Sequence, residues 1–248
     1  MSDTAKRALA CLDLTALGDK EDQASTAALC AKAVTKFGPV AAVCLWPAYV
    51  AQAKTALAGS GVKIATVVNF PSGMEPADDV LAATRKALAD GADEIDVVFP
   101  FPRWLRGEKV AALTLIARVK EACGAKTLKV ILESGAFPSV EKLAKASADV
   151  LEAGADFLKT STGKIAQGAT PEAARTLLEA AARGKTGVKI SGGVRTMADA
   201  AAYLALADEI RGADWASPAT FRFGASGLLD ALLADLEGRA APAPAKGY

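Results

Sequence analysis

Residues 154–164, with the sequence GADFLKTSTGK, combine the end of a helical stretch, a short apolar strand and a lysine near the end of that strand. The opening Gly-Ala-Asp triplet recurs at residues 91–93 and 212–214, and each copy ends a helical stretch. Glycine suits the position after a helix because it adopts the left-handed backbone conformation at little cost. The copies at 91 and 154 lead directly into strands, so the triplet predicts a repeated turn from helix to strand.

Outward from this segment, strand and helix signals alternate along the chain. We expect strands at 8–14, 41–45, 63–68, 94–99, 127–132, 156–160, 187–190 and 220–224. The amphipathic helical stretches between them include 23–36, 48–58, 76–89, 140–153 and 171–182. Eight strands that alternate with helices in 248 residues predict an α/β fold, a single (β/α)8 TIM barrel over residues 1–239. The proline-rich segment 240–248 is expected to be a flexible C-terminal tail.

The alternative fold is an open, doubly wound sheet. Such a sheet usually carries the nucleotide-binding pattern G-x-G-x-x-G after its first strand, and none follows residues 8–14. Two helix starts support the alternating pattern. Thr170 and Pro171 supply an N-cap and a proline at the first helical position, and Thr196 with Asp199 resembles a capping box.

The composition excludes several kinds of catalytic site. The chain contains no histidine, which excludes Ser-His and Cys-His nucleophiles and histidine-ligated metals. A metal held by carboxylates alone stays open, although no acidic residues cluster in that way. The four cysteines have no metal-ligand spacing and are expected to be reduced and mostly buried; they are Cys11, Cys30, Cys44 and Cys123.

Charge and hydropathy bound the partners of the protein. The formal net charge is +1 and no basic cluster is present, so we expect neither a nucleic-acid surface nor one for anionic membranes. No apolar run reaches the ~18 residues of a spanning helix. The first residues lack the apolar core of a signal peptide, which predicts a cytoplasmic protein. Barrels of this kind often pair, so a homodimer is an expectation, although no surface stripe distinguishes it from a monomer or tetramer.

Four charged residues interrupt strands that should be apolar: Asp96, Lys129, Lys159 and Lys189. Parallel strands that are covered on both faces normally consist of apolar residues. A buried charge costs several kcal/mol unless it is paired. One such residue could be a strand end in solvent. Four at similar places in consecutive strands indicate a functional site.

Lys159 and Lys189 are expected to be neighbours because they are thirty residues, or one strand-helix unit, apart. If their ammonium groups lie ~6 Å apart at an effective dielectric constant of ~20, they repel by roughly 2.8 kcal/mol, or about two pKa units. Partial burial acts in the same direction. The pKa of one lysine could then fall far enough to give a free amine that attacks a carbonyl group at neutral pH. Asp96, two strands from Lys159, could pair with the second lysine and relay protons.

Glycine-rich turns follow the last two strands, at residues 191–196 and 224–227. In barrels these two loops are the habitual phosphate site, where backbone N–H groups and helix N-termini meet the anion. Residues 161–164, Ser-Thr-Gly-Lys, could add donors. Together the turns predict a phosphorylated substrate.

Several segments resemble, in the same order, the successive motifs of deoxyribose-phosphate aldolases. They are CLDLTAL, AAVCLWPAYV, KIATVVNFPSG, GADEIDVVFP, LKVILESG, GADFLKTSTGK, VKISGGVRT and RFGASGLL. The resemblance extends from about residue 9 to residue 236, and FLKTSTGK together with KxxGGVRT is highly specific.

The resemblance implies a role for each matching residue. Lys159 matches the lysine that forms the Schiff base, Lys189 the lysine that lowers its pKa, and Asp96 the aspartate that shuttles protons. Lys129 matches a lysine of the charge network. Tyr248 matches a tyrosine that, in some members, enters the site from a mobile tail and helps to protonate the enamine. The substrate-binding and phosphate-binding positions are Asp13, Thr15, Cys44, Lys129, Thr160, Gly163, Lys164, Gly192, Gly193 and Ser226.

The implied activity is that of a class I aldolase, which cleaves 2-deoxy-D-ribose 5-phosphate reversibly to acetaldehyde and D-glyceraldehyde 3-phosphate. The implied partners are a small-molecule sugar phosphate and aldehydes, and no metal or organic cofactor is implied. Two departures bear on phosphate affinity and substrate preference. Gly227 stands where some relatives carry a second serine, and Ala48 where many carry arginine.

Two alternative functions remain. Another Schiff-base barrel lyase, acting on a ketose phosphate or a 2-keto-3-deoxy acid, would share the lysine chemistry but not the whole series of motifs. A catalytically silent barrel that binds sugar phosphates belongs to a different class. The three residues Asp96, Lys159 and Lys189 argue against a pure binder, because binding alone does not require a costly pair of lysines. Turnover of the deoxy sugar tests the first alternative, and covalent trapping tests the second.

Overall fold

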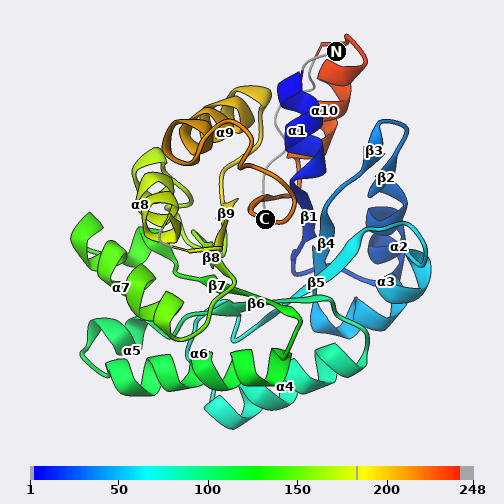
Figure 1. The fold of residues 1–248 in the computed structure, drawn as a ribbon. Coiled ribbons are helices and arrows are strands. Elements are labelled where there is room, and N and C mark those ends of the chain that lie inside the picture. The colour runs from blue at the N-terminus through cyan, green and yellow to red at the C-terminus, as the bar shows by residue number, and fades with distance from the viewer. Residues whose placement is uncertain (1–2, 183, 241–248) are drawn as a thin grey trace.

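The computed structural model describes residues 3–182 and 184–240, and these form a closed barrel of parallel strands with helices around it (Figure 1). The barrel strands are β1 (Leu12–Ala16), β4 (Ala42–Leu45), β5 (Lys63–Val68), β6 (Glu94–Val98), β7 (Thr127–Ile131), β8 (Phe157–Lys159), β9 (Gly187–Ser191) and β10 (Phe221–Ala225). Each strand pairs with the next in sequence, and β1 pairs with β10 to close the ring. The predicted (β/α)8 barrel is therefore confirmed, and the open sheet is excluded.

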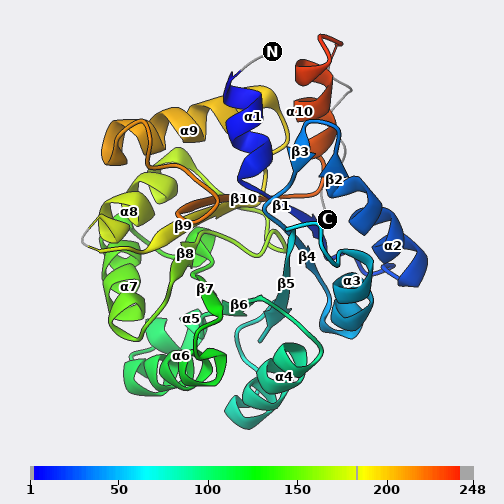
Figure 2. The same ribbon diagram turned by 45° about the vertical axis from the view of Figure 1, so that its right-hand side comes forward.

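Helices cover the outside of the barrel, as both ribbon views show (Figures 1 and 2). They are α1 (Asp3–Ala10), α2 (Gln23–Lys32), α3 (Val50–Ala56), α4 (Ala77–Ala89), α5 (Phe101–Leu105), α6 (Lys109–Cys123), α7 (Val140–Glu152), α8 (Pro171–Ala181), α9 (Met197–Arg211) and α10 (Leu228–Leu236). Short 3-10 helices lie at Pro47–Tyr49 and Ser134–Ala136. Both predicted helix starts are confirmed. Thr170 accepts from the N–H of Ala173 ahead of Pro171, and Thr196 forms a capping box with Asp199.

The predicted boundaries are wrong in two places. The strand expected at 8–14 begins only at Leu12, because residues 3–10 form α1. The buried residues of α1 recur at helical spacing and pack with α9 and α10, so an apolar stretch that looked like strand belongs to a helix. The helix expected at 23–36 ends at Lys32. A two-stranded hairpin of β2 (Val34–Thr35) and β3 (Gly38–Pro39) follows, with Gly38 at a φ of +116°.

The Gly-Ala-Asp triplets close helices as predicted. Their glycines have φ values of +108° at Gly91, +100° at Gly154 and +92° at Gly212, which L side chains rarely adopt. In the first two copies the aspartate also binds the neighbouring strand. Asp93 accepts from the N–H of Ile64 in β5, and Asp156 accepts from the N–H of Leu128 in β7. The triplet therefore ends a helix and attaches the following turn to the barrel.

Side chains of the strands alternate between two cores. One face packs against the helices and forms the large outer core. The other face points into the barrel, where one side is apolar and built from Ala42, Cys44, Ala65, Val67, Val98 and Ile131. Strands β1 and β6 to β10 point charged residues into the same interior. This division places a polar site inside the barrel against an apolar wall.

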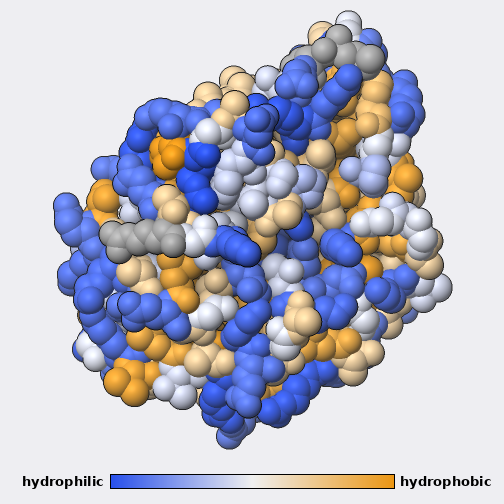
Figure 3. Space-filling model, viewed as in Figure 1, coloured by the Kyte–Doolittle hydropathy of each residue, from blue (hydrophilic) through white to orange (hydrophobic). Residues whose placement is uncertain are grey.

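The surface shows no single dominant apolar area on the face drawn in Figure 3, where the hydrophobic patches are small and separated. The large apolar residues that are exposed come from different elements: Val34, Met74, Val110, Val140 and Ile165. Among the described residues, no helix combines the length and apolar character that crossing a membrane requires.

Candidate active site

Charged side chains from six strands meet inside the barrel and form the feature that we call the charge network. Its members are Asp13, Glu94, Asp96, Lys129, Lys159, Lys189 and Arg222. None of them is more than 5% exposed. All four charges that the sequence singled out are therefore buried, and none is a strand end in solvent. Their mutual pairing offsets the cost of burying them.

Asp96 is the centre of the charge network. One carboxylate oxygen, Oδ2, accepts from Lys159 Nζ at 2.8 Å and from Lys189 Nζ at 2.8 Å. The other oxygen, Oδ1, accepts from Lys129 Nζ at 2.9 Å. Burial alone would raise the pKa of Asp96, but the three ammonium groups hold it well below its usual range. As the sequence predicts, Lys159, Lys189 and Asp96 lie next to one another in the structure.

Lys159 is the lysine whose pKa is lowered. Burial is the largest cause, and the positive charge of Lys189 adds to it, while Asp96 opposes both. The sequence predicts repulsion between the lysines as the first cause of the lowered pKa, whereas in the structure burial is the larger cause. The residues Lys159 and Lys189 are direct partners in the register of β8 and β9, as equal height on adjacent strands requires.

Lys189 has the opposite electrostatic environment. Burial lowers its pKa, but Asp13 and Asp96 raise it well above the usual value. Its Nζ lies 2.6 Å from Asp13 Oδ2 and 2.8 Å from Asp96 Oδ2. Lys189 is thus held as a cation beside Lys159, which has Asp96 as its one carboxylate partner among the described residues. Of these two neighbouring lysines, Lys159 is the one that more readily supplies a free amine.

Two members of the network, Glu94 and Arg222, were not identified from the sequence. Arg222 binds Asp13 Oδ1 at 2.6 Å and Glu94 Oε1 at 2.8 Å, and Glu94 in turn pairs with Lys129. Glu94 is the first residue of β6 and Arg222 the second of β10, so both lie at the amino-terminal end of the barrel. The available signal was a charge inside each expected strand, in EIDVVF and in FRFG.

A small pocket of about 130 Å³ lies over the loops that follow β8, β9 and β10. Four of the expected phosphate-binding residues line it, namely Gly163, Gly192, Gly193 and Ser226. Gly192 and Gly193 have φ values of +87° and +91°. Side chains are rarely tolerated at such φ values, and backbone N–H groups there can face an anion. The pocket is therefore suited in shape and chemistry to a phosphate group.

The other expected binding residues lie close to the network, but several hydroxyls already have backbone partners. Thr160 Oγ1 donates to Ser191 O and accepts from Ser191 N–H, and thereby joins the ends of β8 and β9. Thr15 Oγ1 donates to the carbonyl of Asp13. Cys44 Sγ lies 4.0 Å from Asp96 Oδ2. These three side chains are buried around the network.

Lys164 and Tyr248 complete the expected residues. The side chain of Lys164 is 20% exposed, and its Nζ lies 3.4 Å from Asp19 Oδ1. Tyr248 lies outside the described residues.

Glu133 is a further buried acidic residue, and the sequence did not predict it as part of the site. It follows β7 with a φ of +56°, in the left-handed region that a non-glycine residue rarely adopts. Its carboxylate accepts from the N–H and the hydroxyl group of Thr162. Burial raises the pKa of Glu133. The side chain thus attaches the loop that contains Gly163 and Lys164 to the end of the neighbouring strand.

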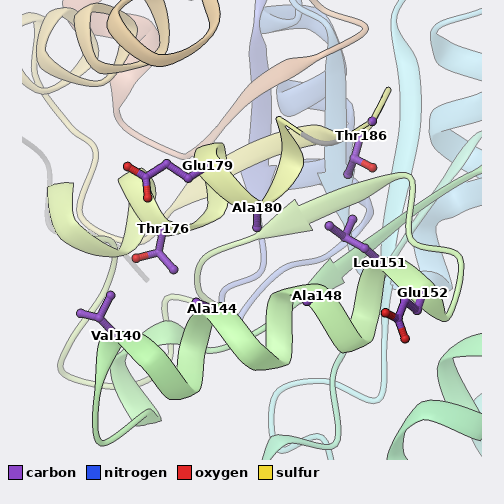
Figure 4. A pocket seen from close by; sticks show the side chains of 10 residues that line it. Val140, Ala144, Ala148, Leu151, Glu152, Thr176, Glu179, Ala180 and Thr186 are labelled. Carbon is purple, nitrogen blue, oxygen red and sulfur yellow. The ribbon is translucent and has the colours of Figure 1, made fainter.

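A groove on the outside of the barrel lacks this chemistry. A groove of about 570 Å³ lies on the outside between α7 and α8, and alanine and leucine side chains form much of its floor (Figure 4). Its carboxylates, Glu152 and Glu179, are exposed and separate from the charge network. Within residues 3–182 and 184–240, no group of three or more potential metal-ligating side chains has the geometry to hold an ion. The charge network with the glycine-lined pocket is the candidate active site.

The arrangement has a definite chemical capacity. A buried amine of lowered pKa can attack a carbonyl carbon, and the resulting nitrogen cation can accept electrons from a breaking carbon–carbon bond. Asp96 Oδ2 lies 2.8 Å from the amine of Lys159, and the ammonium group of Lys189 lies 2.8 Å from the same oxygen. Both groups can therefore exchange protons with the reacting atoms. The glycine-lined pocket can hold an anionic end of a substrate.

Comparisons with known proteins show the family of the chain. The model of the DeoC/LacD aldolase family matches residues 8–233. The chain is 46% identical to a deoxyribose-phosphate aldolase of Agrobacterium fabrum over 244 residues. The aligned region covers 97% of this chain and 94% of that protein.

Solved structures give the same picture. A Toxoplasma gondii ME49 protein, provisionally assigned as a deoxyribose-phosphate aldolase, matches with a TM-score of 0.86 and 29% identity over 96% of this chain and 95% of that one. The tetrameric deoxyribose phosphate aldolase of Aeropyrum pernix matches with a TM-score of 0.78 and 26% identity over 94% and 92%.

Proposed function

The chain belongs to the DeoC/LacD family of aldolases, and on that premise we propose that it cleaves 2-deoxy-D-ribose 5-phosphate reversibly to acetaldehyde and D-glyceraldehyde 3-phosphate. The observation that carries the proposal is the environment of Lys159. Its amine is buried, its pKa is lowered, and it shares Asp96 with a second lysine. The activity of the Agrobacterium fabrum relative supports the choice of substrate.

The reaction begins when the free amine of Lys159 attacks the aldehyde carbon C1 of the open-chain sugar. Loss of water gives an iminium ion, whose positive nitrogen is an electron sink. A base removes the proton from the C3 hydroxyl group, the C2–C3 bond breaks, and its electron pair forms the enamine. C3 thereby becomes the aldehyde carbon of glyceraldehyde 3-phosphate. Protonation of the enamine at C2 and hydrolysis of the new iminium ion release acetaldehyde and restore the amine.

Proton transfer is assigned to Asp96 together with Lys189. Asp96 is within hydrogen-bond distance of the nucleophilic amine, and the Lys189 ammonium group shares the same carboxylate oxygen. In the proposal Asp96 is the base and acid of the proton steps, and Lys189 keeps a positive charge beside Lys159. Tyr248 is a further candidate proton donor to the enamine.

The phosphate group is assigned to the glycine-lined pocket. Gly163, Gly192, Gly193 and Ser226 would present backbone and hydroxyl donors to it, and Lys164 would add a positive charge from the same loop as Gly163. The remaining residues of the proposed substrate site are Asp13, Thr15, Cys44, Lys129 and Thr160. Binding of the phosphate group in this pocket would orient the aldehyde end of the sugar towards Lys159.

The assembly and location of the protein belong to the same proposal. We propose a homodimer in the cytoplasm, since barrels of this kind often pair and the four buried cysteines are free thiols, as in a reducing compartment. The Aeropyrum pernix relative is tetrameric, so the number of copies differs within the family. Sedimentation velocity distinguishes the dimer from a monomer or a tetramer.

Reductive trapping tests the chemistry. The protein is incubated with 2-deoxyribose 5-phosphate, reduced with borohydride, and analysed by peptide mass spectrometry. The proposal requires an adduct on Lys159 that is absent from Lys159→Ala and still present in Lys142→Ala, a variant of an exposed lysine on α7. Absence of an adduct on folded protein, with a related aldolase trapping normally alongside, would sink the proposal. Turnover of a ketose phosphate or a 2-keto-3-deoxy acid in place of the deoxy sugar would favour the rival lyases.

A further inference from the structure

The charge network contains more cationic groups than carboxylates. Its carboxylates are Asp13, Glu94 and Asp96, and its cationic groups are Lys129, Lys159, Lys189 and Arg222. If every group is ionised, the network holds one unbalanced positive charge, and none of its members is more than 5% exposed. A net buried charge is costly, so the arrangement favours loss of one proton from a lysine.

The ion pairs indicate which lysine loses the proton. Lys129 lies within 3.5 Å of Asp13, Glu94 and Asp96, and Lys189 lies within 2.8 Å of Asp13 and Asp96. Lys159 pairs with Asp96 alone among the described carboxylates, and it shares that group with both other lysines. Deprotonation of Lys159 therefore breaks the fewest ion pairs and leaves three positive charges against three negative ones.

Arg222 is the member of the network that supplies the extra cation. Its guanidinium group binds Asp13 Oδ1 at 2.6 Å, binds Glu94 Oε1 at 2.8 Å and donates from Nε to the carbonyl of Pro218 at 2.5 Å. An arginine does not lose its proton under ordinary conditions. Its three partners hold the guanidinium group in place, so a permanent positive charge lies at the amino-terminal end of the barrel.

We propose that Arg222 is a positioning residue that keeps Lys159 in the free-amine form, because its permanent charge occupies Asp13 and Glu94 and leaves Asp96 as the one carboxylate available to Lys159. The proposal rests on the amine chemistry proposed above. It assigns to a residue on β10, two strands from β8 in the barrel, an electrostatic function at the amine of Lys159.

The surroundings of both groups agree with this assignment. Arg222 faces Asp13, Glu94 and the Phe157 ring, whose centroid lies 5.7 Å from its guanidinium carbon. Cys11 is also nearby, and burial raises its pKa to about 12. Arg222 therefore has no other described acid as a direct partner.

Lys159 faces a similarly closed set of groups. They are Asp96, the ammonium group of Lys189, the thiol of Cys44, and Glu133. Burial raises the pKa of the Cys44 thiol and that of Glu133. The carboxylate of Glu133 is hydrogen-bonded to Thr162 and forms no described ion pair, so it acts on Lys159 only through space.

The amino-terminal end is also open enough to be altered without touching the substrate. A hollow of about 580 Å³ lies there, lined by Glu94 and Arg222 and by the exposed Lys6 and Lys63. In register, Arg222 pairs with Lys189 and Lys189 with Lys159, so two strand spacings separate Arg222 from the amine. A change of one unit charge at roughly 10 Å and an effective dielectric constant of about 20 moves a pKa by about one unit.

The test is the pH dependence of kcat/KM for 2-deoxyribose 5-phosphate, whose acidic limb reports ionisation of the free enzyme. Arg222→Met removes the cation and should move that limb to higher pH by about one unit. Glu94→Gln removes a carboxylate and should move it to lower pH. The double variant restores the charge balance of the wild type, so its limb should return close to the wild-type position. Arg222→Lys keeps the charge and should leave the limb in place.

A merely structural role for Arg222 would give a different pattern. In one such pattern, Arg222→Met and Glu94→Gln would each lose kcat without a shift of the acidic limb. In another, the acidic limbs of the two single variants would shift in the same direction and the double variant would have the lowest activity. Either pattern overturns the proposal, as does an unmoved limb in Arg222→Met. If Arg222→Met does not fold, Glu94→Gln decides alone, and an unmoved limb in that variant overturns the proposal.

A second measurement separates this proposal from the proposed function. The rate at which acetaldehyde and cyanoborohydride label Lys159 is followed against pH, and it should shift with the variants as kcat/KM does. Wild-type protein without turnover or labelling would contradict the aldolase function itself. Normal labelling of the wild type with unmoved limbs in the variants would contradict only the role of Arg222.

Discussion

Lys159 and Lys189 lie on neighbouring strands in register, yet their surroundings shift their pKa values in opposite directions. The difference comes from carboxylates. Asp13 and Asp96 both pair with Lys189, whereas Lys159 has only a share of Asp96. Proximity alone would lower the pKa of both lysines, so the position of two aspartates decides which amine has the lowered pKa.

Replacement of each lysine by methionine should separate function from stability. Lys159→Met should abolish turnover, since the nucleophile is lost. Its free energy of unfolding should stay unchanged or rise by about 1 kcal/mol, because the remaining network is balanced and the methionine is apolar. Lys189→Met removes one ion-pair partner from Asp13 and one from Asp96 and should lower the free energy of unfolding by about 3 kcal/mol. Urea denaturation at pH 7 measures both values, and a large loss of stability in Lys159→Met would contradict this account.

At the scale of elements, the loops after β8 and β9 form the glycine-lined pocket by packing backbone on backbone. A Cβ atom built on Gly168 would lie 2.4 Å from the carbonyl oxygen of Gly192. No side chain fits at that distance, so residue 168 must be glycine for the two loops to meet. The carboxylate of Glu133 holds the earlier part of the same loop through Thr162.

Gly168→Ala should therefore impair phosphate binding more than chemistry. We expect KM for 2-deoxyribose 5-phosphate to rise about tenfold or more, a loss of about 1.4 kcal/mol of binding energy. The kcat/KM for unphosphorylated 2-deoxyribose should change much less. Gly184→Ala is the matched control, because a Cβ there meets no atom within 4 Å. An equal loss for both sugars in Gly168→Ala would show that the loop positions the amine rather than the phosphate.

At the scale of the whole molecule, closure of the barrel joins the two ends of the chain through the charge network. Asp13 on β1 and Arg222 on β10 are 209 residues apart in sequence and are bonded at 2.6 Å. Burial would raise the pKa of Asp13, but Lys189, Arg222 and Lys129 lower it below the usual range. The pKa of Asp96 is lowered in the same way by Lys129, Lys159 and Lys189. These carboxylates therefore link global stability to pH.

The sign of that linkage is fixed by the lowered pKa values. An unfolded aspartate titrates near ~3.9, so Asp13 and Asp96 contribute their full stability above about pH 5 and lose it as the pH falls through their folded values. Asp13→Asn should cost about 3 kcal/mol at pH 7. The difference from the wild type should shrink as the pH approaches 2. Urea midpoints measured from pH 7 to pH 2 test this, with exposed Asp79→Asn as the control. A difference independent of pH would contradict the linkage.

Local patterns were sufficient to predict the barrel and to single out the buried lysines. The alternation of strand and helix signals, the glycine that closes each helix in the Gly-Ala-Asp turns, and the charges at Asp96, Lys159 and Lys189 are all properties of short segments. Period and turn chemistry act between near neighbours, so they can be read without tertiary contacts. The same local rule failed at residues 3–10, where an apolar stretch suited both a strand and a helix, and packing against α9 and α10 decided for the helix.

The sequence by itself therefore determined the (β/α)8 architecture and pointed to the lysine pair and its aspartate. Only the tertiary structure decided that Glu94 and Arg222 belong to the same network and that Lys159, not Lys189, has the lowered pKa. The physical reason is that a pKa depends on burial and on charges a few ångströms away. In a closed barrel those charges come from strands at opposite ends of the chain, and no periodicity along the sequence records which of them meet.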